Sequence, residues 1–235
     1  LDVMRSRNGR RVHLAHLQYY AYGKTDKGVF VSAAERLAEQ LREQRDATFD
    51  MGLVAFGPAF TATADLPLEY NLYRSSGSVL RPAYFCESAN EDCFGVMPLV
   101  HKASHPVHAV QWATGLELAL RADPWRCALS IDHPNGGSFL NYPELIAMLM
   151  SKARRDEQLS RCHRHATDRT GLGAVTREMT PADIAIVTRA APARALGLKR
   201  KGHLGPGADG DVTVYHDRTS DPQSMFARPR WVIKA

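Results

Sequence analysis

Cysteine and long apolar runs are both scarce in this chain of 235 residues, and each scarcity excludes a class of protein. The four cysteines are too few and too scattered to cross-link a fold of this size, which favours a reducing, cytoplasmic compartment. Charged residues, histidine or glycine interrupt every apolar run before the roughly 18 to 20 residues that a membrane-spanning helix needs. Residues 1–20 also lack the apolar stretch of a secretory signal. We therefore expect neither membrane insertion nor export.

A strong excess of one charge is missing as well. The 30 Lys and Arg residues against 25 Asp and Glu residues give a formal net charge of +5, and the basic residues are spread along the chain. Such a distribution gives little support to nucleic-acid binding. Hydrophobic residues make up 44% of the chain, which is enough to bury a substantial core.

Segments typical of strands alternate with segments typical of helices. Short apolar runs predict strands over residues 11–17, 49–57 and 127–131. Helical spacing of apolar residues predicts helices over residues 32–45, 107–121, 142–153 and 180–189. Ser32 with Glu35 predicts a capping box, and Thr180-Pro181 marks a second helix start. This alternation favours a parallel α/β architecture.

The carboxyl-terminal part has a different pattern. Residues 154–177 are charged and rich in His and Gly, and we expect a surface excursion there. Residues 211–216 and 230–233 alternate like strands of a small separate sheet. Cys162, His163 and His165 form a dense cluster, but their spacing matches no common zinc site.

Two of the predicted strands end in residue types that bind metals. His16 closes the first strand and Asp132 closes the strand over residues 127–131. Active sites of parallel α/β folds lie at the carboxyl ends of strands. Because side chains alternate along a strand, we expect His16 to face the interior and His13 to pack against the outer helices. Each site residue also has a structural interpretation, as a hydrogen-bonded strand-end histidine and a turn-forming aspartate.

Five segments carry a resemblance to known proteins. Residues 190–198, a helix ending in Leu-Gly-Leu, and residues 201–211 resemble the carboxyl-terminal signature of the amidohydrolase superfamily, with Gly210 where Ala is usual. Residues 13–18, 108–118 and 132–139 are similar to the A-subunit of formylmethanofuran dehydrogenase and to that of its bacterial formyltransferase/hydrolase counterpart. The Asp-His-Pro-Asn turn and the Gln-Trp-Ala helix distinguish this group from dihydroorotases and hydantoinases.

The resemblance implies a (β/α)8 TIM barrel flanked by a β-sandwich. The first-strand His-x-His and the carboxylated lysine of strand four would lie upstream of Leu1. The chain would then be the carboxyl-terminal half of the barrel, with strands five to eight in residues 1–197 and the end of the sandwich in residues 198–235. A complete barrel usually takes about 250 residues, which agrees with the expectation that this is part of a longer protein.

The resemblance also implies a zinc centre of two ions, with further ligands upstream. His16 matches the strand-five metal ligand, and Asp132 matches the strand-eight residue that binds metal and takes the proton from the attacking water. The strand-six candidate, residues 49–57, has no histidine, and Asp50 is its weak substitute. Substrate-binding candidates are Asn135, Gln18 and His133; the first two could equally be ordinary turn or strand residues.

The implied reaction is hydrolysis or formation of the formamide bond of formylmethanofuran, in one-carbon metabolism. Implied partners are the other subunits of the complex, and residues 65–105 are a candidate for contacting them or for lining the substrate entrance. The sequence does not distinguish the dehydrogenase from the formyltransferase/hydrolase assembly. Two alternatives stay open: a general cyclic-amide or amide hydrolase of the same superfamily, and a non-catalytic barrel scaffold.

Overall fold

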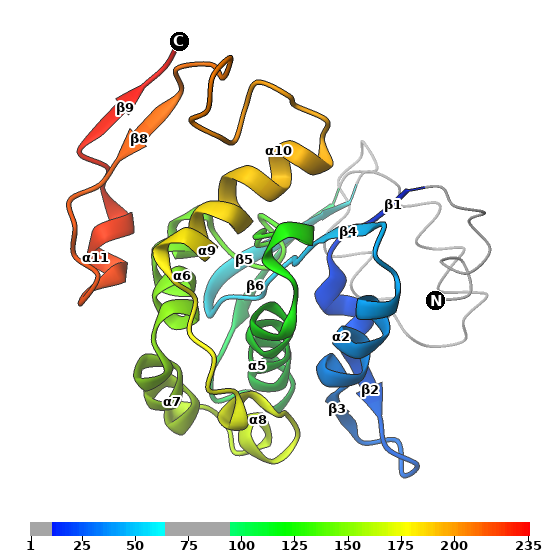
Figure 1. The fold of residues 1–235 in the computed structure, drawn as a ribbon. Coiled ribbons are helices and arrows are strands. Elements are labelled where there is room, and N and C mark those ends of the chain that lie inside the picture. The colour runs from blue at the N-terminus through cyan, green and yellow to red at the C-terminus, as the bar shows by residue number, and fades with distance from the viewer. Residues whose placement is uncertain (1–10, 64–94) are drawn as a thin grey trace.

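The computed structural model describes residues 11–63 and 95–235 and contains a three-stranded parallel sheet, of which β1 and β4 are labelled in Figure 1. Its strands are β1 (Val12–Leu14), β4 (Ala47–Asp50) and β7 (Cys127–Ala128), in the order β1-β4-β7. Val12 pairs with Ala47 and Phe49 pairs with Cys127. The predicted parallel α/β architecture is confirmed. The three strands are direct neighbours, so no further strand lies between them, whereas four barrel strands were expected.

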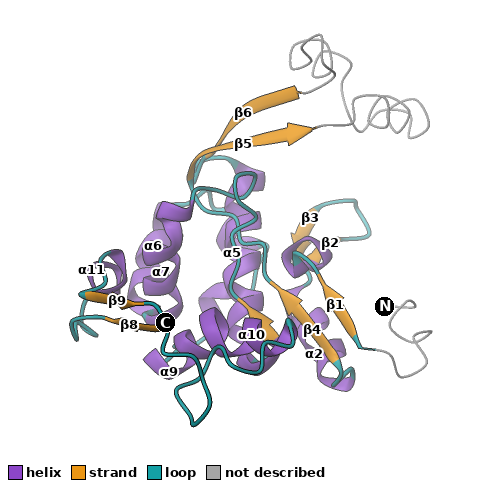
Figure 2. Cartoon of the chain, turned by 90° about the horizontal axis from the view of Figure 1, so that it is seen from above, coloured by secondary structure: helices purple, strands orange, loops and turns teal. Residues whose placement is uncertain are grey.

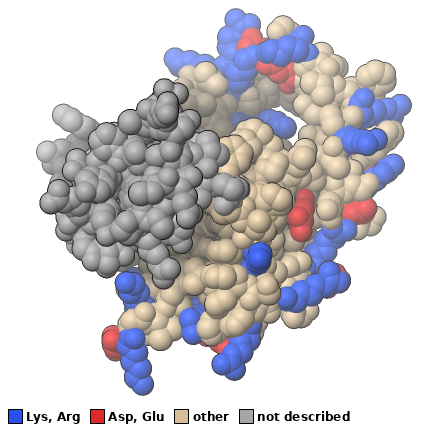
Figure 3. Space-filling view, turned by 180° about the vertical axis from the view of Figure 1, so that it is seen from behind, with Lys and Arg blue, Asp and Glu red and all other residues tan. Residues whose placement is uncertain are grey.

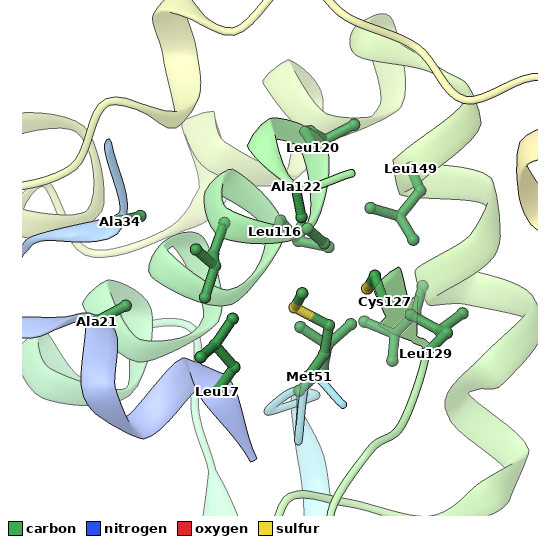
Figure 4. Close-up of a cluster of buried hydrophobic side chains, with 14 of the residues drawn as sticks. Leu17, Ala21, Ala34, Met51, Leu116, Leu120, Ala122, Cys127, Leu129 and Leu149 are labelled. Carbon is green, nitrogen blue, oxygen red and sulfur yellow. The ribbon is translucent and has the colours of Figure 1, made fainter. Parts of the chain in front are cut away.

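Two helices connect these strands along the chain. Helix α2 (Ala34–Glu43) lies between β1 and β4, and the longer α5 (Pro106–Arg121) lies between β4 and β7. The His105 ring caps α5 by accepting from the backbone N–H groups of Val107 and His108. The two helices pack against each other. Their inner faces and the sheet form the core, in which Leu17, Met51, Leu116, Cys127 and Leu149 converge (Figure 4).

The predicted capping box at the start of α2 does not form. Ser32 instead donates through its hydroxyl to the buried Glu117 carboxylate at 2.8 Å, and Glu35 pairs with Arg121 at 2.9 Å. Glu117 is 2% exposed and needs donors, because an unpaired buried charge is costly. The Ser32 hydroxyl still accepts a local bond from Ala34 N at 3.1 Å, so the box fails because Glu35 is paired with Arg121 instead.

A series of helices follows β7. The structure places α6 (Tyr142–Met150), α7 (Lys152–Arg161), α8 (His165–Asp168), α9 (Pro181–Ala185), η5 (Ile186–Ala190) and α10 (Ala191–Ala195). At the start of α9, Thr180 and Asp183 bond reciprocally, which confirms the predicted helix start. Segment η5 is a turn of π-helix, and its Val187 carbonyl accepts from Leu129 N just beyond β7 at 2.9 Å. Short 3-10 turns complete the set: η1 (Leu17–Ala21), η2 (Pro124–Arg126), η3 (Phe139–Asn141) and η4 (Leu172–Ala174).

The charged stretch over residues 154–177 is not simply a surface excursion. Arg155 on α7 is 1% exposed and donates to the backbone carbonyls of Met148 and Arg177, at 2.7 and 2.8 Å. A guanidinium has five donors and can satisfy several carbonyl groups that helix and loop ends leave free. Arg155 thus stabilises the junction of α6 and α7 from inside.

Three two-stranded antiparallel sheets lie around this body. They are β2 (Tyr22–Lys24) with β3 (Phe30–Ser32), β5 (Gly57–Thr63) with β6 (Gly95–His101), and β8 (Val212–Val214) with β9 (Trp231–Ile233). The β5–β6 hairpin extends away from the parallel strands (Figure 2). Helix α11 (Pro222–Ala227) follows β8 in the chain and packs against α6. The two predicted carboxyl-terminal strands are confirmed, and residues 65–94 of the predicted entrance segment lie outside the described residues.

The basic side chains are spread over the surface, as their spread along the sequence suggests. Lys and Arg side chains are scattered over the face in Figure 3, around a broad area with few charges. Within residues 11–63 and 95–235, no helix combines the length and apolar character that crossing a membrane requires.

Candidate active site at the strand ends

The structure brings His16 and Asp132 together. Nδ1 of His16 lies 3.5 Å from Oδ1 of Asp132, although the two residues follow different strands. The Asp132 side chain is 16% exposed and that of His16 is 42% exposed, so the pair is partly shielded but open to solvent. The carboxyl ends of β1 and β7 therefore meet, as a parallel sheet requires.

Both residues have unusual backbone conformations. His16 has φ +50° and Asp132 has φ +46°, in the left-handed region that non-glycine residues rarely adopt. The turn after Asp132 is closed by a hydrogen bond from Gly136 N to the Asp132 carbonyl at 2.7 Å. Left-handed non-glycine residues concentrate at functional sites, where the surrounding structure holds them in place. Both strand ends thus turn sharply at the residues that carry the candidate chemistry.

Asp50 contacts both His13 of β1 and His16 just beyond it. Its Oδ2 accepts from His16 N at 3.2 Å and from His13 Nε2 at 3.3 Å, and its Oδ1 accepts from the Ser130 hydroxyl at 2.5 Å. The His16 ring is also near, with Nε2 3.8 Å from Asp50 Oδ1. Because protein donors occupy both of its oxygens, Asp50 is placed to orient His16.

The prediction for His13 is wrong. Instead of packing against the outer helices, its ring bonds to Thr48 Oγ1 at 3.0 Å and to Asp50. The alternation rule fails because β1 ends at Leu14, and His16 lies in a left-handed turn beyond it. Both histidines therefore reach the same carboxylate.

Oδ2 of Asp132 accepts two hydrogen bonds. The Tyr19 hydroxyl donates to it at 2.9 Å and the Asn135 side-chain amide donates to it at 2.9 Å. This leaves Oδ1 as the oxygen that faces His16. The amide of Asn135 thus acts on Asp132, whereas the sequence predicted that it orients a substrate.

Sequence reasoning missed Tyr19. The 3-10 turn η1 begins directly after His16, and side chains three residues apart eclipse in such a turn. The Tyr19 ring accordingly lies near the His16 ring and is tilted to it, with centroids 6.1 Å apart. Burial, and then the hydrogen bond to Asp132 and its charge, raise the pKa of the Tyr19 phenol. A His followed by Tyr at this spacing would have revealed the contact only if the 3-10 turn had been recognised.

Gln18 is not a substrate ligand. It is fully buried, its Oε1 accepts from Val54 N at 3.2 Å, and its Nε2 donates to Tyr22 Oη at 2.6 Å and to the Gln111 carbonyl at 3.2 Å. Gly115 of α5 makes room for it, since a Cβ there would lie 2.0 Å from Oε1. The predicted substrate contact is therefore wrong, because the amide is used inside the fold.

His133 stays available to a ligand. The residue is exposed, its Nδ1 lies 3.1 Å from the Gly137 carbonyl, and its ring stacks on Phe139 with centroids 3.8 Å apart. Phe139 is 60% exposed as well. An exposed pair of stacked rings beside Asp132 provides a flat surface that a ring-bearing substrate can contact.

A second group of histidines lies near the Asp132 turn, with His101 at the end of β6 and His105 and His108 at the start of α5. His101 is 9% exposed and its Nε2 lies 2.9 Å from the Asn135 carbonyl. Its ring meets that of His108, which stacks on His105. Burial lowers the pKa of His108 to about 4, and the neighbouring histidines act in the same direction.

The geometry of His16 and Asp132 fits shared metal ligation. Two ligand atoms on a tetrahedral zinc ion, each about 2.0 to 2.1 Å away, are separated by about 3.3 Å. The observed 3.5 Å is close to that value. Among residues 11–63 and 95–235, no three His, Cys, Asp or Glu side chains are grouped to hold a metal ion. The described part of the chain thus offers two ligands of the appropriate kind.

The chain is similar to curated proteins of two organisms. The chain is 37% identical to the A-subunit of the formyltransferase/hydrolase complex Fhc of Methylorubrum extorquens over 99% of its own length and 43% of that protein. It is 41% identical to "Protein FwdA" of Methanocaldococcus jannaschii over 85% of its length and 35% of that protein. The chain therefore spans less than half the length of these relatives. The resemblance drawn from the residues is confirmed.

A solved structure is similar too. The crystal structure of the formyltransferase/hydrolase complex from Methylorubrum extorquens, in complex with methylofuran, has a chain that matches with a TM-score of 0.84 and 37% identity, over 99% of this chain and 43% of that one. The model of the amidohydrolase family matches residues 6–230. The chain therefore belongs to the amidohydrolase family.

Proposed function

We propose that this chain belongs to the A-subunit of a formyltransferase/hydrolase or formylmethanofuran dehydrogenase complex, where it hydrolyses or forms the formamide bond of an N-formylated furan cofactor. The observation that carries the proposal is the 3.5 Å separation of His16 Nδ1 and Asp132 Oδ1 at two strand ends. Similarity to the Fhc relative across nearly the whole chain supports this choice of substrate class. A general amide hydrolase shares the strand-end geometry but not this similarity.

The strand order supports an adjusted place in a (β/α)8 barrel. If Asp132 follows strand eight, the neighbouring strand β4 is strand seven and β1 is strand six. His16 then corresponds to the strand-six ligand rather than to the strand-five ligand. This assignment also accounts for the lack of histidine in β4. Barrel strands one to five would be supplied by other parts of the protein. Strands β8 and β9 of this chain would belong to the flanking sandwich.

His16 and Asp132 are the residues that would hold zinc. A zinc ion lowers the pKa of bound water to about 7 and polarises the substrate carbonyl. A metal-bound histidine is oriented by a partner on its other side, and Asp50 is placed for that role. The remaining ligands of the proposed two-ion centre would come from outside the described residues.

Asp132 is the proton carrier in this proposal. In the hydrolytic direction, water attacks the formyl carbon and Asp132 takes the water proton. The C–N bond then breaks, and the proton moves from Asp132 to the leaving amine nitrogen, giving the free amine and formic acid, which loses its proton to solvent as formate. Formation of the formamide runs the same steps in reverse. In this proposal the exposed His133–Phe139 stack contacts the furan ring.

The test uses the natural protein with the subunits that co-purify with it. We expect one to two zinc ions per chain by metal analysis, and release of formate from formylmethanofuran that a chelator stops and zinc restores. Wild-type protein that binds no metal and releases no formate would support the non-catalytic scaffold instead. A fully active monomer would support the general amide hydrolase.

A further inference from the structure

Tyr19 is held in place by Tyr22, which is itself bonded to the buried Gln18. The buried Gln18 is fixed by Val54 N and by the Gln111 carbonyl, and it donates to Tyr22 Oη at 2.6 Å. The Tyr22 ring meets Tyr19 edge to face, with centroids 5.7 Å apart. Tyr19 N donates to the His16 carbonyl at 3.0 Å, which closes the turn between them. Backbone and ring contacts thus determine where the Tyr19 hydroxyl lies.

The Tyr19 hydroxyl and the Asn135 amide converge on one oxygen of Asp132. Both donate to Oδ2 at 2.9 Å, while Oδ1 faces His16 Nδ1. A carboxylate with a single bond to a neighbour can rotate about its terminal torsion, which has broad and shallow preferences. Two donors from different segments remove that freedom. They distinguish the two oxygens, which are chemically identical in a free carboxylate.

We propose that Tyr19 is a positioning residue for Asp132: with Asn135 it holds Oδ2, so that Oδ1 is the oxygen presented to the reaction. The inference rests on the proposed function, in which Asp132 takes the water proton. Oδ1 is thereby held toward His16, on the side where the proposed zinc would bind, while Oδ2 keeps its two donors. The phenol itself gains and loses no proton in the cycle.

The adjacent tyrosine offers a matched control. Tyr20 belongs to the same 3-10 turn, is 62% exposed, and is not a partner of Asp132 in the structure. The substitutions Tyr19→Phe and Tyr20→Phe each remove one hydroxyl from neighbouring positions. They would be made in the natural protein with its co-purifying subunits, and formate release from formylmethanofuran would be measured at several substrate concentrations.

Tyr19→Phe is expected to lower kcat by about 10- to 100-fold, the range found when groups that orient a ligand are removed, with KM changed less than about twofold. Tyr20→Phe should match the wild type in both constants. Because Asn135→Ala still leaves one donor on Oδ2, the double variant should lose more than the product of the two single losses. Equal kcat in the two tyrosine variants, or a change in KM alone, would overturn the proposal.

A crystal structure of Tyr19→Phe gives a readout that does not depend on activity. We expect the Asp132 carboxylate to rotate, so that neither oxygen keeps the wild-type distance to His16 Nδ1. An unchanged carboxylate would reject the positioning role even if the enzyme is active. A rotated carboxylate in a protein without formamide hydrolysis would instead keep the positioning role and reject the proposed function.

Discussion

Gly52 leaves no room for a side chain beside His16. A Cβ at Gly52 would lie 2.7 Å from His16 Cβ and 2.9 Å from His16 Cα, and Gly52 itself has φ +61°. The residue therefore meets two conditions that only glycine satisfies easily: a left-handed backbone and a close approach to a turn that is left-handed too. The segment after β4 thus acts as the support on which the His16 turn rests.

Gly52→Ala is expected to displace His16. The added methyl group must push the His16 turn away while Ala adopts a strained φ, a combination that we expect to cost about 1 to 3 kcal/mol of stability. Zinc affinity should fall together with the melting temperature. Gly28→Ala is the control, because Gly28 has φ +74° but nothing within 4 Å of its Cβ position. Equal zinc affinity in both variants would contradict this role.

Asp132→Asn should abolish formamide hydrolysis and leave the fold intact. The amide keeps the shape of the carboxylate but cannot take a proton from water. We expect a loss of more than about 100-fold in kcat, the lower bound for removal of a general base. Circular dichroism and melting would confirm the fold. Asp26→Asn, at an exposed position in the β2–β3 turn, should retain full turnover; wild-type turnover in Asp132→Asn would remove Asp132 from the mechanism.

Gln18→Met tests whether the Gln18 side-chain amide has a structural role instead of the predicted contact with the substrate. Its replacement leaves buried polar groups of Val54 and Tyr22 without their partner, so we expect a loss of about 1 to 3 kcal/mol of unfolding free energy. KM for the formylated substrate should change little where the variant is folded. Gln40→Met on α2, at a half-buried position, should cost much less. A raised KM with unchanged stability would return Gln18 to the substrate site.

His108 makes stability depend on pH. Its pKa is about 4 in the folded protein against 6.5 for an ordinary histidine, so the unfolded chain binds more protons between these values. Its contribution is fully present above pH 6.5 and is lost as the pH falls toward 4. The melting temperature of His108→Asn should therefore drop less than that of the wild type between pH 7 and about 4.5. His216→Asn, at an exposed position, should follow the wild type.

Residues 1–235 expressed alone are expected to be inactive and prone to aggregation. The side chains of β9 are open to solvent, with Trp231 61%, Val232 69% and Ile233 54% exposed. Exposed apolar strands promote association between copies. Val232→Lys should raise the soluble fraction measured by sedimentation, and it should not restore activity. A soluble, zinc-loaded monomer from the unaltered chain would contradict the assignment to barrel strands six to eight alone.

Features set by local interactions could be predicted from the sequence, and those set by distant partners could not. The start of α9 depends on Thr180 and Asp183, three residues apart, and it was predicted correctly. Ser32 has an equally good local pattern, but Glu117 is its partner across the fold. His16 and Asp132 were singled out as candidates because each closes a predicted strand, and the structure places them side by side. Tyr19 and Gln18 were missed or misassigned because a 3-10 turn decides which of them reaches the surface.

The hydrogen bond from Leu129 N to the Val187 carbonyl affects how the sheet can be extended. On the side of β7 opposite β4, a helix carbonyl already occupies the donor that an incoming strand would use. A strand added there replaces one hydrogen bond with another. Pairing with a strand of a second molecule therefore gains little free energy at this position. The Val187 carbonyl of η5 thus occupies the Leu129 N–H group, and only a strand that makes further contacts of its own can displace it.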